Sequence, residues 1–242
     1  MSDTAVVIGV GASAGLGAAL CRRFGREGLH VFVAGRTKEK LDAIVEEVTS
    51  AGGSAEAAVC DVTSASDQDK LFDAVAAKGR CAAVLYNAGS NAIIPFEDLT
   101  DDQFETFWRV CTFGAFLTAK RAAPLLAGQA GGGSLLFTGA SASLRGRANF
   151  AHFAAAKGAL RNLAQSLARE YGPKGVHVGH VIVDGVIDGD MVRSRFAEYL
   201  DRLGEDGGLN PDAIAEAFWT LHAQHRSAWT HELDVRPYKE NW

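Results

Sequence analysis

The chain has 242 residues and a formal net charge of -5, with acidic and basic residues interspersed along it. This balance does not predict a nucleic-acid surface, and no apolar run is long enough to span a bilayer, so we expect neither a nucleic acid nor a membrane as partner. The four cysteines form no C-x-x-C pair and no secretory leader is recognisable, so we expect a cytoplasmic protein.

Short apolar strands alternate with amphipathic helices along the whole chain. The strands are expected at residues 5–8, 31–34, 57–60, 82–85, 135–138, 176–183 and 229–235. The helices are expected at 18–28, 38–49, 67–77, 100–126 and 151–171, with one more opening at Pro211. Strands that are apolar on both faces predict a covered parallel sheet. The fold class is therefore α/β, a single-domain Rossmann-type doubly wound parallel sheet of about seven strands with helices on both faces, over residues 1–242.

A glycine-rich turn follows the first expected strand and opens the first expected helix. Its glycines are Gly11, Gly15 and Gly17. Backbone N–H groups at a helix N-terminus face phosphate, and the helix dipole favours its charge. A glycine-rich turn without a ligand has the same pattern, so this motif is weak alone. In its strand–turn–helix context it predicts a site for a dinucleotide diphosphate.

Arg36 and Thr37 follow the second expected strand, where the adenosine ribose would lie. An acidic residue there would bind the free 2′-hydroxyl of NAD(H), and none occurs until Glu39. A guanidinium binds a 2′-phosphate in two places, although a solvated surface arginine gives the same pattern. We therefore expect NADP(H) to be preferred, with NAD(H) possible.

The motifs of this chain, and the order in which they follow one another, resemble those of the short-chain dehydrogenase/reductase family over essentially the full chain. They are the glycine turn, Asp61-Val62, Asn87-Ala88-Gly89, Lys157 in an Ala-rich helix, and Asp184-Gly185. The resemblance implies a seven-stranded sheet, a nicotinamide cofactor, a small-molecule substrate and a homodimer or homotetramer. Together with the turn and Arg36, it implies cofactor contacts from Gly11, Ser13, Ala14, Gly15, Leu16, Gly17, Arg36, Thr37, Asp61, Val62, Asn87, Ala88, Gly89, Lys157, Gly185 and Ile187.

The catalytic set of that family is Asn, Ser, Tyr and Lys, and only Lys157 is kept. The tyrosine position holds Phe153, the asparagine position Cys111 and the serine position Ala140, unless a one-residue shift of the loop brings Ser141 there. A phenyl ring cannot donate a proton, so the usual route for alcohol–ketone interconversion is interrupted. The resemblance leaves Lys157 and Ser141 as the candidate catalytic residues.

Several groups are candidates for the missing proton donor. Lys157 would serve if burial lowered its pKa, and Asp184 would serve if protonated. Ser141 and Ser143 carry hydroxyls of nearly neutral acidity. His152 precedes Phe153, and on a helix it points about 100° away, so it is expected to face outside the pocket.

Residues 186–210 are charged and rich in glycine, and by the resemblance they form a lid over the substrate. Met191, Phe196, Tyr199 and Leu203 could be its inward face, or ordinary amphipathic packing. His222 and His225 lack further ligands nearby, so no metal is expected.

Two functional hypotheses remain. The first is an NADP(H)-binding oxidoreductase that transfers hydride to an apolar or activated acceptor by a non-standard proton route. The second is a catalytically inactive NADP(H)-binding sensor or scaffold.

Overall fold

The computed structural model describes residues 2–240 and contains a seven-stranded sheet of order β3-β2-β1-β4-β5-β6-β7. All neighbouring strands in it are parallel. The strands are β1 (Thr4–Ile8), β2 (His30–Gly35), β3 (Ser54–Val59), β4 (Cys81–Tyr86), β5 (Gly133–Ala140), β6 (Val176–Val183) and β7 (Glu232–Val235). The expected fold class is confirmed.

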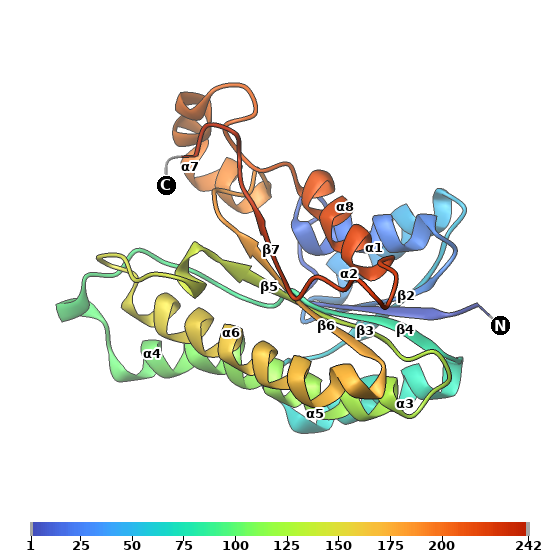
Figure 1. The fold of residues 1–242 in the computed structure, drawn as a ribbon. Helices are drawn as coiled ribbons and strands as arrows, with labels where there is room; N and C mark the ends of the chain where they lie inside the picture. The colour runs from blue at the N-terminus through green and yellow to red at the C-terminus, as the bar shows by residue number, and fades with distance from the viewer. Residues whose placement is uncertain (1, 241–242) are drawn as a thin grey trace.

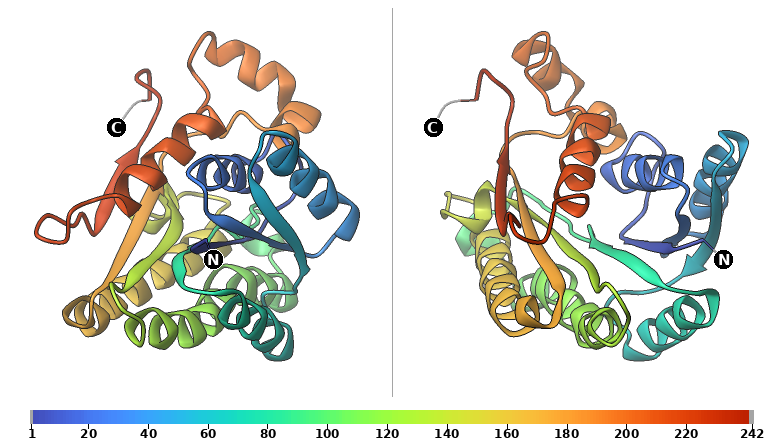
Figure 2. Two further views of the ribbon diagram at one scale, coloured as in Figure 1. Left: turned by 90° about the vertical axis from the view of Figure 1, so that its right-hand side faces the viewer. Right: turned by 45° about the vertical axis from the view of Figure 1, so that its right-hand side comes forward.

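Helices cover both faces of this sheet (Figures 1 and 2). On one face lie α1 (Leu16–Arg26), α2 (Lys38–Ser50) and α8 (Pro211–His222). On the other lie α3 (Ala65–Lys78), α4 (Asp101–Trp108), α5 (Gly114–Ala127) and α6 (Ala151–Tyr171). Two apolar cores lie between the sheet and these two layers of helices. The remaining helix, α7 (Asp190–Leu203), lies beyond the ends of the strands and buries none of its side chains.

The strand order reverses between β1 and β4, because the chain first builds β1 to β3 outward and then crosses back. In open parallel sheets, ligands bind at such a reversal, outside the carboxyl ends of the strands. The glycine turn follows β1 there, and the segments after β4, β5 and β6 begin at the same edge of the sheet. The topology therefore brings the expected site residues to one place.

Two of the differences from the sequence expectation have a visible physical cause. The helix expected over 100–126 contains a π-helical turn at Arg109–Phe113, where the Tyr86 hydroxyl donates a hydrogen bond to the Val110 carbonyl. Such an insertion is typical of functional sites. The last strand is only Glu232–Val235 and not 229–235. Before it, the Trp229 ring stacks on His177, and the Thr230 carbonyl accepts from the His177 ring, so side-chain contacts replace strand pairing.

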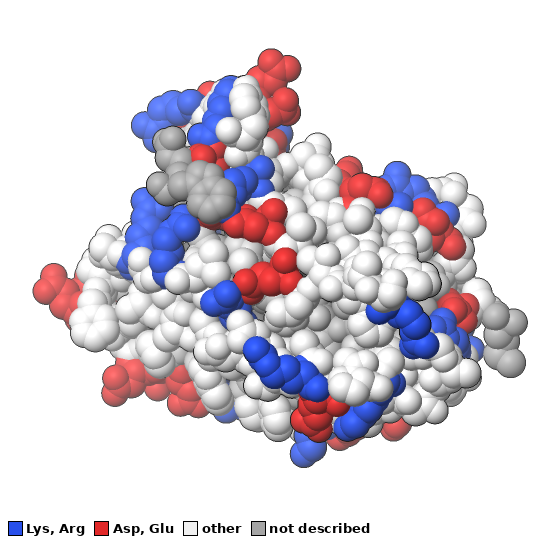
Figure 3. All heavy atoms as spheres, in the orientation of Figure 1, with Lys and Arg blue, Asp and Glu red and all other residues white. Residues whose placement is uncertain are grey.

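Basic and acidic side chains are intermixed on the face shown in Figure 3. Among residues 2–240, no helix combines the length and apolar character that a membrane crossing requires. The expectations about nucleic acid and cellular location remain predictions.

Candidate active site

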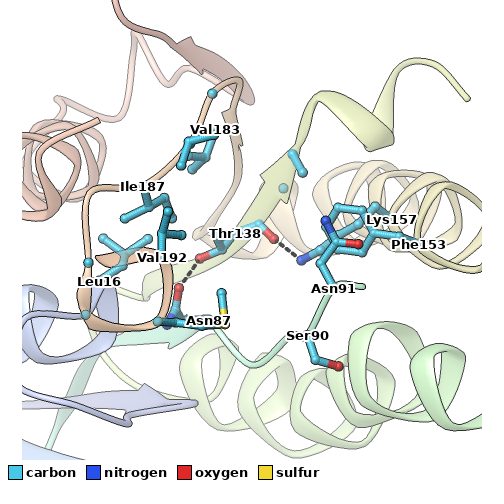
Figure 4. A pocket seen from close by; sticks show the side chains of 18 of the residues that line it. Leu16, Asn87, Ser90, Asn91, Thr138, Phe153, Lys157, Val183, Ile187 and Val192 are labelled. Carbon is cyan, nitrogen blue, oxygen red and sulfur yellow. Dashed lines mark hydrogen bonds between the residues drawn. The ribbon is translucent and has the colours of Figure 1, made fainter. Parts of the chain in front are cut away.

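A cavity of about 450 Å³ opens at the carboxyl ends of β1, β4, β5 and β6 (Figure 4). Its walls come from the glycine turn, from four residues of the segment after β4, from residues 138–141, from one face of α6 and from most of residues 183–192, without Asp184 and Asp188. This volume lies within the range of small-molecule and cofactor sites, and apolar surface predominates in its lining.

The glycine turn fits the phosphate role expected of it. A Cβ on Gly17 would lie 2.9 Å from the Gly9 carbonyl oxygen, so only glycine lets α1 pack this closely on the end of β1. Gly15 is the N-cap of α1, and the first turn of this helix has neither a side-chain cap nor an acidic residue. The first N–H groups of α1 are thus left to a ligand. The Ser13 hydroxyl, expected to contact phosphate, donates to Glu47 on α2.

The expected adenosine-side residues lie at the ends of β2 and β3. Arg36 and Thr37 are exposed, and Val62 is buried. The N–H of Thr63 donates to the Asp61 carboxylate and lowers its pKa, and the nearby charge of Arg36 lowers it further. Arg36 and Asp61 therefore lie within electrostatic range of each other at this end of the sheet.

A chain of hydrogen bonds connects Asn87, Thr138 and Lys157 across the cavity floor (Figure 4). The Asn87 amide donates to the Gly9 carbonyl over 3.2 Å and accepts from the Thr138 hydroxyl over 3.1 Å. The Lys157 ammonium donates to the Thr138 carbonyl over 2.8 Å. Lys157 is only 4% exposed, and burial lowers its pKa. Lys157 also lines the cavity.

Phe153 and Lys157 line the cavity together, with the Lys157 Nζ 5.8 Å from the centre of the Phe153 ring. Cys111 is fully buried outside the lining. Ala140 and Ser141 both line the cavity. Ser143 is buried and accepts a hydrogen bond from the Ala140 N–H.

The other candidate proton donors do not reach the cavity lining. His152 is fully buried with its ring 4.1 Å from that of Phe107, outside the pocket as expected. The Asp184 carboxylate is also buried, and it faces Arg145 at 3.4 Å and Arg236 at 3.7 Å.

Among the described residues, the titratable side chains in the lining are those of Lys157 and Asp190. Sequence reasoning did not single out Asp190. Its position in the first turn of α7 is common for an acidic residue, so the sequence carried no functional signal for it.

The expected lid residues lie beside the glycine turn. Ile187 and Gly185 line the cavity, and Ile187 also pairs with Leu209. A Cβ on Gly189 would lie 2.9 Å from the Ala14 carbonyl oxygen, so this segment contacts the turn directly.

Three of the four apolar side chains expected on an inward face of α7, or in ordinary amphipathic packing, are exposed. Met191, Phe196 and Tyr199 are 59%, 53% and 43% exposed, although Met191 also borders the cavity. The physical reason is that α7 lies past the edge of the sheet, where no other layer covers it. Within residues 2–240, no group of three or more His, Cys, Asp or Glu residues is placed to hold a metal ion.

Comparison with known proteins agrees with this geometry. The family model described as short chain dehydrogenase matches residues 5–200. A short-chain dehydrogenase from Rhodopseudomonas palustris is 35% identical and superposes with a TM-score of 0.84, covering 98% of this chain and 99% of its own.

Two further relatives bear on the chemistry. A metagenomic short-chain oxidoreductase in complex with NADP is 29% identical over 97% of both chains, with a TM-score of 0.80. A Bacillus subtilis protein named probable 2,4-dienoyl-CoA reductase [(2E)-enoyl-CoA-producing] is 33% identical over 72% of this chain and 68% of its own. The glycine turn, the reversal of strand order and these matches agree, and this chain belongs to the short-chain dehydrogenase/reductase family of NAD(P)-binding oxidoreductases.

Proposed function

We propose that this protein is an NADP(H)-dependent oxidoreductase that reduces an activated, largely apolar acceptor, such as a conjugated double bond, a quinone or an iminium. The observation that carries the proposal is Lys157, a buried amine with a lowered pKa in a cavity where Phe153 replaces the usual proton donor. The name of the Bacillus subtilis relative, which implies reduction of a conjugated double bond, supports the acceptor class.

The residues present fit the cofactor. The uncapped first turn of α1 and the close packing at Gly17 suit a diphosphate, and exposed Arg36 suits a 2′-phosphate. Asn87, Gly89 and Lys157 line the cavity where a nicotinamide and its ribose would be held. The metagenomic relative in complex with NADP supports the preference for this cofactor.

When bound, NADPH supplies a hydride to the acceptor. In this proposal the Lys157 ammonium supplies the proton that a conjugated double bond or a quinone takes up with the hydride, whereas an iminium takes up the hydride alone. Ser141 orients the acceptor by donating a hydrogen bond. Burial makes Lys157 a stronger acid than an exposed lysine, because desolvation disfavours its charged form. An activated acceptor needs less help from an acid than a ketone does, which suits a site without the tyrosine phenol. Phe153 contributes apolar surface to the cavity.

We also propose that residues 186–210 close over the bound substrate and set its specificity, and that the protein is a homodimer or homotetramer like many members of its family. Ile187, Val192 and Leu16 lie together at one wall of the cavity, where movement of the segment would change its width (Figure 4). Light scattering of the purified protein measures the association state, and a monomer would contradict the second part.

The test is a fluorescence titration with NADPH and NADH, followed by a panel of enones, quinones and iminium ions with NADPH oxidation as the readout. We expect micromolar NADPH binding, weaker NADH binding and turnover of at least one acceptor class. NADPH binding with no oxidation above background would favour the inactive sensor or scaffold. No binding of either cofactor would contradict both.

A further inference from the structure

Behind the cavity floor, four side chains from four elements form one hydrogen-bonded chain, which is buried at its serine and histidine and half-buried at its glutamate and arginine. It begins at Ser143, in the short turn after β5, and continues through His180 on β6 to Glu232 on β7. The Ser143 Oγ lies 3.4 Å from the His180 Nε2, and the His180 Nδ1 lies 3.0 Å from the Glu232 Oε2. Arg161 on α6 closes it with two hydrogen bonds of 2.7 Å to the Glu232 carboxylate.

The donor and acceptor roles in this chain follow from its chemistry. The Glu232 carboxylate can only accept, and its pKa is lowered by the Arg161 guanidinium first and by His180 as well. The His180 Nδ1 must then carry the proton. Burial lowers the pKa of His180 to about 4, so its ring is neutral near pH 7 and its Nε2 is an acceptor. The Ser143 hydroxyl must therefore donate to Nε2, while its oxygen accepts the Ala140 N–H over 3.1 Å.

The His180 ring also supports the cavity floor from behind. A Cβ on Gly139 would lie 2.3 Å from the His180 Nε2, so the ring packs directly against the backbone of Gly139. Gly139 and its neighbours Thr138 and Ala140 line the cavity on their other side. His180 itself is fully buried, and one thickness of backbone separates it from the ligand space.

The same chain fixes the helix that carries Lys157. Arg161 follows Lys157 by four residues, so the two side chains project from one side of α6. Lys157 binds the Thr138 carbonyl on β5, and Arg161 binds Glu232 on β7. Two successive turns of α6 are thus attached to the sheet on either side of the His180 ring, and the charge of Lys157 acts on His180.

From these contacts we propose that Ser143, His180, Glu232 and Arg161 are positioning residues, which set the placement of Lys157 against the loop bearing Ala140 and Ser141 for the hydride and proton transfer. This inference rests on the proposed function. None of the four touches the substrate, because His180 is buried and none of them lines the cavity. Their effect is on geometry, and a misplacement of about 1 Å in a reacting group costs on the order of 100-fold in rate.

The structure supplies a matched control at the opposite end of the sheet. Ser134, at the start of β5, is 2% exposed, and its Oγ lies 2.7 Å from the Nδ1 of His222. Ser134→Ala and Ser143→Ala each remove one buried hydroxyl bonded to a histidine, but only Ser143 lies beside the cavity. A purely structural role would make the two substitutions equivalent.

The experiment compares wild type, Ser143→Ala and Ser134→Ala, with Glu232→Gln as a second break in the chain. We expect Ser143→Ala and Glu232→Gln to lower kcat by about 10- to 100-fold, with KM and the NADPH dissociation constant within about twofold of wild type. Ser134→Ala should lower Tm without changing kcat. Equal kcat values for the two alanine variants would overturn the proposal.

A second readout needs no acceptor and separates this inference from the proposed function. The pKa of Lys157 is followed by NMR in protein labelled at lysine. Loosening the loop and α6 admits water, so the pKa of Lys157 should rise in Ser143→Ala and stay at its wild-type value in Ser134→Ala. If the wild type reduces no acceptor, the proposed function fails, and an unchanged Lys157 pKa in Ser143→Ala would then overturn the positioning role independently.

Discussion

Replacing Lys157 with Met tests the proposed chemistry most directly, because the two side chains are similar in length and only lysine carries a proton. The substitution removes the hydrogen bond to the Thr138 carbonyl, and bonds to charged groups contribute about 1.5–3 kcal/mol. It also removes an ammonium that burial already destabilises, as the lowered pKa shows. These two effects oppose each other, so we expect the free energy of unfolding to change by less than about 2 kcal/mol.

The effect on catalysis should be far larger than that on folding. Loss of a general acid costs about 10²- to 10⁴-fold in rate, whereas loss of one contact to the cofactor ribose, worth about 1.4 kcal/mol, weakens NADPH binding by about tenfold. The assay is single-turnover oxidation of saturating NADPH by an acceptor that the wild type reduces. Saturation removes the binding effect from the measured rate. A hydride-transfer rate within about threefold of wild type would refute the role of Lys157.

The same reasoning predicts the direction in which the rate changes with pH. The acid must hold its proton to react, so the wild-type rate should fall as pH rises through the pKa of Lys157, which burial places below the usual range of lysine. Lys157→Met should lack this decrease. A wild-type rate that rises over the same pH range would assign Lys157 as a base.

Three further outcomes are expected. Arg36→Gln should weaken NADPH binding by about tenfold, which is the low end of the range for a charged hydrogen bond because the Arg36 side chain is exposed. NADH binding should stay unchanged in parallel fluorescence titrations, and equal losses of affinity for both cofactors would contradict the assignment of Arg36. Phe153→Tyr places a phenol near the Lys157 ammonium and should raise NADPH-dependent ketone reduction by about 100-fold, whereas an unchanged rate would show that the missing tyrosine is not the limiting defect. The free energy of unfolding should fall by on the order of 3 kcal/mol as pH decreases from 6.5 to about 4, because unfolded His180 binds a proton that the folded ring does not. Urea unfolding at several pH values, with His180→Phe for comparison, measures this loss, and the same pH dependence in both proteins would assign it to other groups.

The sequence by itself determined the fold class and the family, and it predicted the residues of the cofactor end of the site. These depend on local patterns: the apolar runs that form β1 to β6, the glycine turn between β1 and α1, and Lys157 four residues after Phe153. Each pattern spans a few consecutive residues, so backbone preference and periodicity are enough to identify it. That the position where the family resemblance implies a tyrosine holds Phe153 was visible for the same reason.

Only the tertiary structure decided which polar groups share the cavity. Asp184 and Asp190 are both acidic and six residues apart, yet Asp190 lines the cavity and Asp184 is buried against two arginines. Likewise Ser141 faces the cavity, while Ser143 lies behind it, bonded to His180 thirty-seven residues away. The direction and partners of these side chains depend on contacts between elements far apart in the sequence. No local pattern encodes such contacts, because they exist only once α6, β6 and β7 have packed together.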